Sequence, residues 1–155
     1  MNNNFFSQTL LIVFSASAVY AASPRKIAYE RGENIFVADL DGTHSKKVAN
    51  GALPDISPDG KTMLMDVDCG AEHERKNWDG PQPTIEKLGL GVDKAVRVTG
   101  KNDFVWEPFW LSKDEFLCIM QKENENEPSI YRMSIDGQNP KLIVKHARTP
   151  SASAP

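Results

Sequence analysis

The chain has 155 residues and a formal net charge of −3. This length supports one modest hydrophobic core once a leader is removed. The basic residues form no continuous stripe, so nucleic-acid binding has no electrostatic support and we expect no nucleic-acid partner.

Residues 1–22 are predicted to be a signal peptide. The apolar stretch at 9–20 is shorter than the roughly 20 residues that a transmembrane helix needs. Small side chains at Val19 and Ala21 suit cleavage after Ala21, with Ala22 as the second choice. An uncleaved membrane anchor is the alternative. We therefore expect a periplasmic or secreted protein with no membrane span after cleavage.

Residues 23–146 contain short β-strand patterns rich in Ile, Val, Phe, Tyr and Met. Several are apolar on both faces, which is typical of a sheet packed on both sides. No helical periodicity follows the leader, so an all-β fold is predicted. About ten strands are expected, near residues 26–29, 34–40, 46–49, 62–67, 84–90, 94–98, 104–106, 115–121, 130–135 and 142–144.

The composition changes at the end of the chain, and two cysteines are present. Residues 147–155 are mostly Ser, Ala, Thr and Pro, which predicts a disordered tail. Export would bring Cys69 and Cys118 into an oxidising compartment, where a disulfide can form. The alternative is that Cys118, in an apolar strand-like segment, is simply a core residue.

Turn residues separate the predicted strands. Three Asp-Gly dipeptides are typical of tight turns, because Gly accepts a positive φ. Ser57 beside Asp59 could suggest a nucleophile, but the sequence contains no G-x-S-x-G elbow. We interpret these residues as turn formers instead, together with the related positions: Asp41, Gly42, Ser57, Pro58, Asp59, Gly60, Ser112, Asp114, Asp136 and Gly137.

Three strand-and-turn segments, at 34–42, 84–91 and 129–137, recur with a spacing of roughly 45–50 residues, which is typical of propeller blades. The first, with residues 54–61, resembles the TolB-like propeller family and its WD40-like PD40 repeat. The family pattern is I-x-V-x-D-x-D-G followed by P-x-W-S-P-D-G-K, with Ile56 here in place of Trp. A weaker second copy carries Trp110, Ser112 and Asp114.

The resemblance covers roughly residues 25–145 and implies a propeller that binds other proteins in the periplasm or outside the cell. The expected fold is two and a half to three antiparallel blades, an incomplete ring as a single chain. Ring closure removes open sheet edges, so self-association that closes a ring is one expectation. Some family members are the propeller half of prolyl-oligopeptidase-like serine peptidases.

Two groups of residues are candidate sites. Trp78, in a polar loop, is a candidate contact residue, whereas Trp106 and Trp110 fit either a binding surface or the packing between blades that the resemblance implies. A polar run could bind Ca²⁺ or Zn²⁺, but its spacing matches no known metal motif. We predict no metal site there; its residues are Asp66, Asp68, Glu72, His73 and Glu74.

The sequence thus favours an exported, non-enzymatic protein-binding or scaffold module with a protein partner in the periplasm or cell envelope. No cofactor and no catalytic residue are predicted. The alternative is the propeller part of a prolyl-oligopeptidase-like hydrolase system whose catalytic domain is missing from this chain.

Overall fold

The computed structural model describes residues 25–67, 82–100 and 104–153, so the predicted signal peptide lies outside it. Within those ranges the chain is all-β, as predicted, and it has no helix that could cross a membrane. The strands are β1 (Lys26–Arg31), β2 (Asn34–Asp39), β3 (Lys46–Asn50), β4 (Ala52–Ile56), β5 (Thr62–Val67), β6 (Thr84–Gly89), β7 (Val96–Arg97), β8 (Phe104–Trp110), β9 (Glu115–Gln121), β10 (Ser129–Ser134) and β11 (Lys141–Val144).

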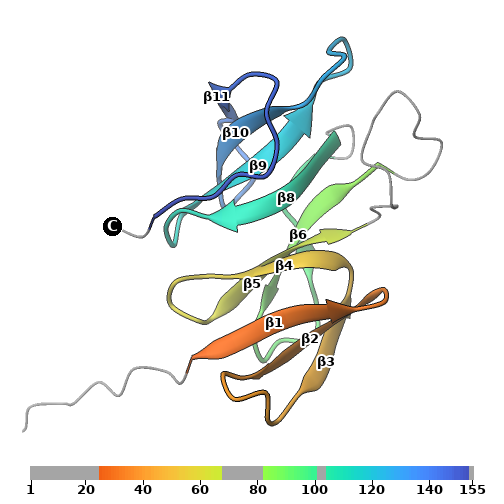
Figure 1. The fold of residues 1–155 in the computed structure, drawn as a ribbon, viewed down its shortest axis with the longest axis vertical. Coiled ribbons are helices and arrows are strands. Elements are labelled where there is room, and N and C mark those ends of the chain that lie inside the picture. Colours follow the sequence, from red (N-terminus) through yellow and green to blue (C-terminus); the bar gives the residue numbers. More distant parts are fainter. Residues whose placement is uncertain (1–24, 68–81, 101–103, 154–155) are drawn as a thin grey trace, which may run out of the picture.

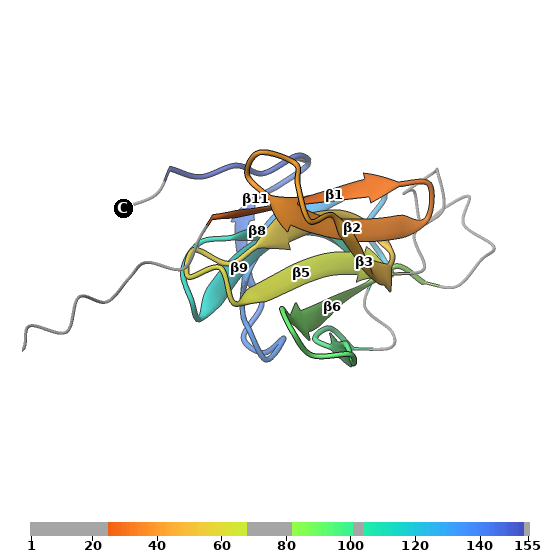
Figure 2. The ribbon, with the colours of Figure 1, turned by 90° about the horizontal axis from the view of Figure 1, so that it is seen from below.

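The strands form three antiparallel sheets that follow one another along the chain (Figure 1). The first sheet has the order β1-β2-β3, the second β4-β5-β6-β7 and the third β8-β9-β10-β11. Each strand pairs with its neighbour in sequence, which short turns make feasible in antiparallel sheets. Figure 2 shows β1 and β2 of the first sheet above β5 and β6 of the second.

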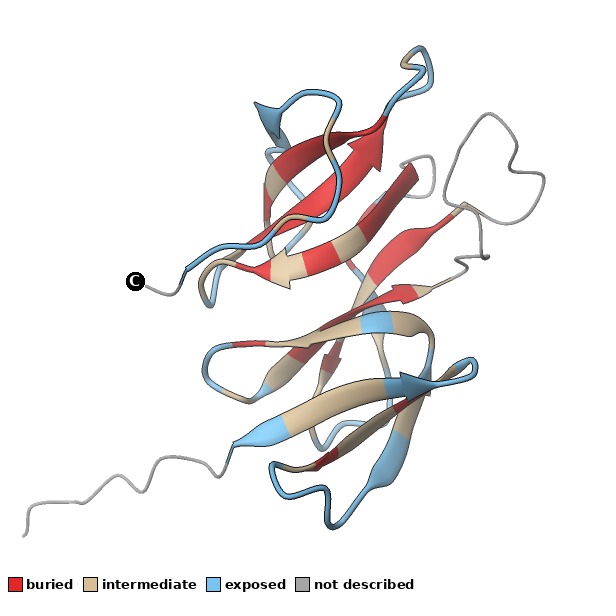
Figure 3. Cartoon of the chain, in the orientation of Figure 1, coloured by how far each residue is buried: buried red, intermediate tan, exposed pale blue. Residues whose placement is uncertain are grey.

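Apolar side chains between the sheets form the core (Figure 3). The second sheet is packed on both faces, because side chains alternate along a strand. Met63 and Met65 of β5 pack with Ile35 of the first sheet. Leu64, between them, packs in the cluster that contains Phe116 of the third sheet. The run of apolar residues in β5 is therefore explained by the two sheets that pack on its opposite faces.

The first sheet is less buried than the other two. Of the residues in its strands, only Ile35 and Ala38 are buried. Figure 3 shows β1 mostly half-buried or exposed, whereas β8, β9 and β10 of the third sheet are largely buried and only its edge strand β11 is exposed. The first sheet thus has a packing partner on one side only among the described residues.

Strand β4 is absent from the predicted strands, because Pro54 interrupts it. Leu53, before this proline, has a φ of 47°, and the ladder shifts register between Ala52 and Asp55. A β-bulge of this kind lets a strand continue past a proline. The structure therefore corrects the prediction of a loop in this segment.

Strand β8 has the same kink. Glu107 has a φ of 51° and precedes Pro108, and the register shifts between Trp106 and Phe109. The strand therefore continues to Trp110, beyond the predicted end at Trp106. The predicted strand at 94–98 is shorter in the structure, where β7 contains two residues.

The kinks connect successive sheets. The Leu53 N–H donates to the carboxylate of Glu30 in β1 at 3.1 Å. In the same way, the Glu107 N–H donates to the carboxylate of Asp66 in β5 at 2.9 Å. Each leading strand, β4 or β8, is thus attached at its kink to an acidic side chain of the preceding sheet.

Asp55 makes a second connection, between β4 and β8. Its carboxylate accepts the Trp110 N–H at 2.7 Å, and its carbonyl accepts the Trp110 indole Nε1–H at 3.0 Å. Burial raises the pKa of the Asp55 carboxyl, while hydrogen bonds from the N–H groups of Trp110 and Ile56 oppose the rise. The pair holds the second and third sheets together at their leading strands.

We expect Asp55→Ala to lower the free energy of unfolding by about 1–3 kcal/mol, because it leaves the Trp110 N–H without its acceptor. Asp55→Asn is the matched control, since its side-chain oxygen still accepts that N–H. It should lower the free energy by less than half as much. Urea unfolding followed by tryptophan fluorescence measures both. Equal losses in the two variants would contradict this role for the hydrogen bond.

The end of the chain continues past β11 as an irregular segment. Residues 147–153 form neither helix nor strand, and the predicted disorder of the tail remains a prediction. In Figure 1 this segment returns from β11 across the third sheet, toward the side on which β8 lies.

Candidate functional site

The predicted turn residues form local hydrogen bonds. The Ser57 hydroxyl donates to the Asp59 carboxylate at 2.7 Å and accepts the Thr62 N–H at 3.0 Å. The same carboxylate accepts the Lys61 N–H at 3.1 Å. Ser57 is 5% exposed. Its hydroxyl therefore serves the turn into β5 and is not presented to a substrate.

The other predicted turns follow related geometries. The Ser134 hydroxyl donates to Asp136, as Ser57 does to Asp59, and the Asp41 carboxylate accepts the N–H of Thr43. In a fourth turn the roles reverse, because the Asp114 N–H donates to Ser112 Oγ at 3.2 Å. All four turns place their acidic residue at the surface between two strands.

Three turn positions require glycine, for its backbone conformation or because a side chain has no room there. Gly60, which follows Pro58 and Asp59, has a φ of 69°, a left-handed conformation that glycine adopts without strain. Gly137 has a φ of 77°, and a Cβ added there would lie 1.9 Å from the Val98 carbonyl oxygen. A side chain at Gly137 would push the β10–β11 turn away from the second sheet. Gly42 also has a positive φ, of 83°.

The tryptophan candidates lie in different environments. Trp106 in β8 is completely buried and forms an edge-to-face pair with Phe104 at a centroid distance of 5.3 Å. Trp110, 7% exposed, packs in the core between the second and third sheets. The structure thus places both rings in the interior rather than on a contact surface. Trp78 lies outside the described residues.

Of the polar run considered for metal binding, the structure describes Asp66 alone. This residue is buried in β5, and one carboxylate oxygen accepts the Glu107 N–H. The other candidates, Asp68, Glu72, His73 and Glu74, lie outside the described residues, as does Cys69. Cys118 is buried in β9, and its thiol donates to Met133 Sδ at 3.4 Å.

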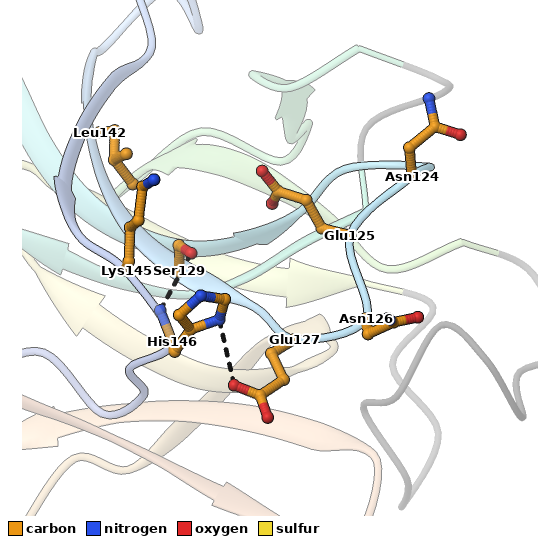
Figure 4. A pocket seen from close by; sticks show the side chains of 8 residues that line it. All are labelled: Asn124, Glu125, Asn126, Glu127, Ser129, Leu142, Lys145 and His146. Atoms are coloured by element: carbon orange, nitrogen blue, oxygen red, sulfur yellow. Dashed lines mark hydrogen bonds and ion pairs between the residues drawn. The ribbon is translucent and has the colours of Figure 1, made fainter.

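A pocket of about 510 Å³ lies at one end of the third sheet (Figure 4). It is enclosed by the β9–β10 loop on one side and by β11 with the segment after it on the other. Its lining combines charged, amide, hydroxyl and apolar groups, from Asn124, Glu125, Asn126, Glu127, Ser129, Leu142, Lys145 and His146.

Local hydrogen bonds fix both walls of this pocket. In the loop, the Glu125 N–H donates to the Lys122 carbonyl at 3.0 Å, and Gln121 Nε2 donates to the Glu125 carbonyl at 2.9 Å. Across the pocket, the His146 N–H donates to Ser129 Oγ at 3.2 Å. These bonds fix the backbone at Glu125 and hold the C-terminal segment against β10.

The pocket lining contains two carboxylates, Glu125 and Glu127, together with Lys145 and His146. Glu127 forms an ion pair with His146, with 3.1 Å between the carboxylate and Nδ1. Figure 4 shows the Glu125 side chain pointing toward the C-terminal segment, whereas Asn124 and Asn126 point away. The Glu125 Oε2 atom is buried and has no hydrogen-bond partner among the described residues. A buried carboxylate oxygen without a donor is costly, so this position favours a cationic donor from a ligand.

The sequence did not reveal this pocket. Glu125 lies twenty residues before the adjacent pair Lys145 and His146. One signal was present: the loop at 122–128 carries three Glu residues against one Lys, directly between two apolar strands. The pairing of β9 with β10 and of β10 with β11 brings the loop and the C-terminal segment together, and this placement turns the Glu125 side chain into the pocket.

The turn carboxylates predict how stability depends on pH. The Ser57 hydroxyl and then the Lys61 N–H lower the pKa of Asp59 below its ordinary value of 3.8. A lowered pKa means that Asp59 stabilises the fold above about pH 4, and this contribution is lost as the pH falls through the folded-state pKa. Asp59→Asn should therefore be less stable than the parent at about pH 7 and match it near pH 2.

Urea unfolding at several pH values measures this difference. Asp114→Asn is the matched control, because in that turn Ser112 is the acceptor and the Asp114 carboxylate lies 3.7 Å from Lys113 at the surface. The control should change stability little at any pH. A difference between parent and Asp59→Asn that stayed constant with pH would contradict the assigned role.

Comparisons with known proteins bear on the fold. No protein-family model and no curated protein matches this sequence. Among solved structures, TolB from Agrobacterium tumefaciens is similar, with a TM-score of 0.55 and 17% sequence identity. The match covers 76% of this chain and 43% of that chain, so this chain spans less than half of its structural relative. The three sheets are therefore TolB-like propeller blades, two with four strands and one with three, in an incomplete ring as predicted.

Proposed function

We propose that the chain is an exported, non-enzymatic protein-binding module, and that the pocket beside the β9–β10 loop receives a basic side chain of a protein partner. The observation that carries this proposal is the buried Glu125 oxygen without a donor, in a pocket open to solvent. The ammonium of a lysine or the guanidinium of an arginine would supply that donor.

The surroundings of Glu125 fit a peptide segment better than a small metabolite. Leu142, 39% exposed, gives the pocket wall an apolar surface that can cover the aliphatic stem of a long basic side chain. Asn124 and Asn126 point outward from the loop, where amide groups can bind the backbone of an extended segment. The pocket would thus anchor one side chain while the loop contacts its neighbours.

The location in the periplasm or outside the cell rests on the predicted leader at 1–22, and a protein partner of the cell envelope is expected there. The TolB-like fold supports a binding role because propellers present loops at the ends of their blades. Cell fractionation with mass measurement of the mature chain tests the location. Recovery of an unprocessed chain from the cytoplasm would contradict export.

We expect Glu125→Gln to weaken the binding of a lysine-containing peptide about tenfold, because a charge-assisted hydrogen bond is lost. Fluorescence anisotropy with end-blocked peptides measures the dissociation constant. A peptide with glutamine in place of lysine should bind the parent chain as weakly as the lysine peptide binds the variant.

Glu123→Gln is the matched control, since Glu123 is an exposed residue of the same loop that does not line the pocket. It removes the same charge from the loop and should change the dissociation constant less than threefold, as expected for an exposed charge. Equal weakening by the two variants would show that only the overall charge matters, and the proposed pocket role of Glu125 would be wrong.

A further inference from the structure

Among the described residues, the first sheet has no counterpart of the strand that leads each of the other two sheets. Ile35, Ile85 and Ile130 occupy the second position of β2, β6 and β10, and they pair with Glu30 in β1, Asp66 in β5 and Ile119 in β9. β1 is therefore the counterpart of β5 and β9. In the second and third sheets those strands pair with β4 and β8 on their other edge. No described strand pairs with that edge of β1.

The segment after β11 shares a backbone feature with the kinks of β4 and β8. Thr149 has a φ of 55° and precedes Pro150, as Leu53 precedes Pro54 in β4 and Glu107 precedes Pro108 in β8. A positive φ is uncommon outside glycine. Among the described residues it occurs directly before a proline at these three sites and at Asn139, in the turn between β10 and β11. The residues after the kink also agree with β4, where Pro54 is followed three positions later by Ser57, as Pro150 is by Ser153.

The place of this segment in the chain agrees with the same assignment. The kink at Leu53 follows the last residue of β3 by three positions, and the kink at Thr149 follows the last residue of β11 by five. The segment is therefore where the leading strand of a next sheet would lie. Residues 147–153 are exposed apart from Ala147 and Pro150, which are half-buried, and they belong to no sheet.

We propose that residues 148–153 of one copy of this chain pair with the open edge of β1 in a second copy and complete its first sheet. Addition of an extended segment to a sheet edge is an established form of protein recognition. Within one copy, the second sheet separates the third sheet, across which this segment runs, from β1 (Figure 1). The acceptor is therefore another copy.

The pairing of the other sheets fixes the register. The residue after the kink proline, Asp55 or Phe109, lies opposite Leu64 or Leu117. The counterpart of these leucines in β1 is Ala28, because Leu64, Leu117 and Ala28 pair with the residue two positions after the shared isoleucine. Ser151 of one copy should therefore lie opposite Ala28 of the other.

The same register brings together opposite charges. The residue before each kink, Ala52 or Trp106, lies opposite Asp66 or Ile119, and their counterpart in β1 is Glu30. Arg148, directly before Thr149, should therefore face Glu30 of the second copy. Opposite charges directly across an antiparallel pair are stabilising.

The hydrogen bond that Glu30 already makes is compatible with this arrangement. Asp66 lies opposite Ala52 in the neighbouring strand and at the same time accepts the Glu107 N–H from the next sheet. Glu30 accepts the Leu53 N–H in the same way. It can thus face a new strand without losing its contact to β4.

A reciprocal exchange between two copies would give every sheet four strands. Each copy contributes three sheets, so the pair would have six, within the range of four to eight blades found in propellers. Exchange of an identical segment between two copies is a common route to a symmetric dimer. It would also cover the β1 edge, which is otherwise open to aggregation.

Intermolecular disulfide formation tests the register. In a background with Cys69→Ser, the pair Ala28→Cys and Ser151→Cys in one chain should give a covalent dimer on mild oxidation. The matched control, Ala28→Cys with Ser153→Cys, shifts the thiol by two residues and should cross-link at most a tenth as fast. No dimer from the first pair, or equal rates for both pairs, would overturn the proposal.

Sedimentation of the purified chain over a concentration series tests the energetics. The parent chain should dimerise, Arg148→Glu should raise the dimer dissociation constant about threefold to tenfold, and a chain ending at His146 should remain a monomer. A peptide of residues 145–155 should bind that shortened chain. A dimer that persists unchanged without the segment would overturn the proposal, and if the shortened chain does not fold, the cross-linking result decides.

Discussion

Successive sheets of this protein are joined by one recurring hydrogen bond. A residue with positive φ, directly before a proline, turns its N–H away from its own ladder and donates it to a carboxylate of the preceding sheet. Leu53 does so to Glu30, and Glu107 does so to Asp66. The kink that interrupts the ladders of β4 and β8 thus supplies a hydrogen bond from each of these strands to the preceding sheet.

This connection explains the distribution of burial. The second sheet lies between two neighbours and contributes apolar side chains from both faces of β5. Among the described residues the first sheet has one neighbouring sheet, and most of its side chains are half-buried or exposed. The proposed binding site for a basic side chain lies beside the third sheet. The proposed contact between two copies lies at the β1 edge of the first sheet.

Much of the fold could be predicted from local chemistry. Ten of the strands were predicted from Asp-Gly turns and from runs of β-branched and aromatic residues. Turn and strand preferences of this kind act over a few residues, so they can be recognised in the sequence. β4 was missed because Pro54 is a strand breaker by local rules, and only the neighbouring sheet makes its bulge favourable. The pocket around Glu125 was missed because its walls are joined by pairing across two strands.

The sequence by itself determined the all-β class, the turns and the TolB-like resemblance, since each depends on residue types at short spacing. Only the tertiary structure decided that Trp106 and Trp110 are interior residues, that Ser57 serves a turn, and that Glu125 points into a pocket. The tertiary structure also gave Thr149 the backbone conformation of Leu53 and Glu107. Those properties depend on contacts between segments that are distant in the sequence. The register of the sheets sets which segments meet, and no single segment contains that information.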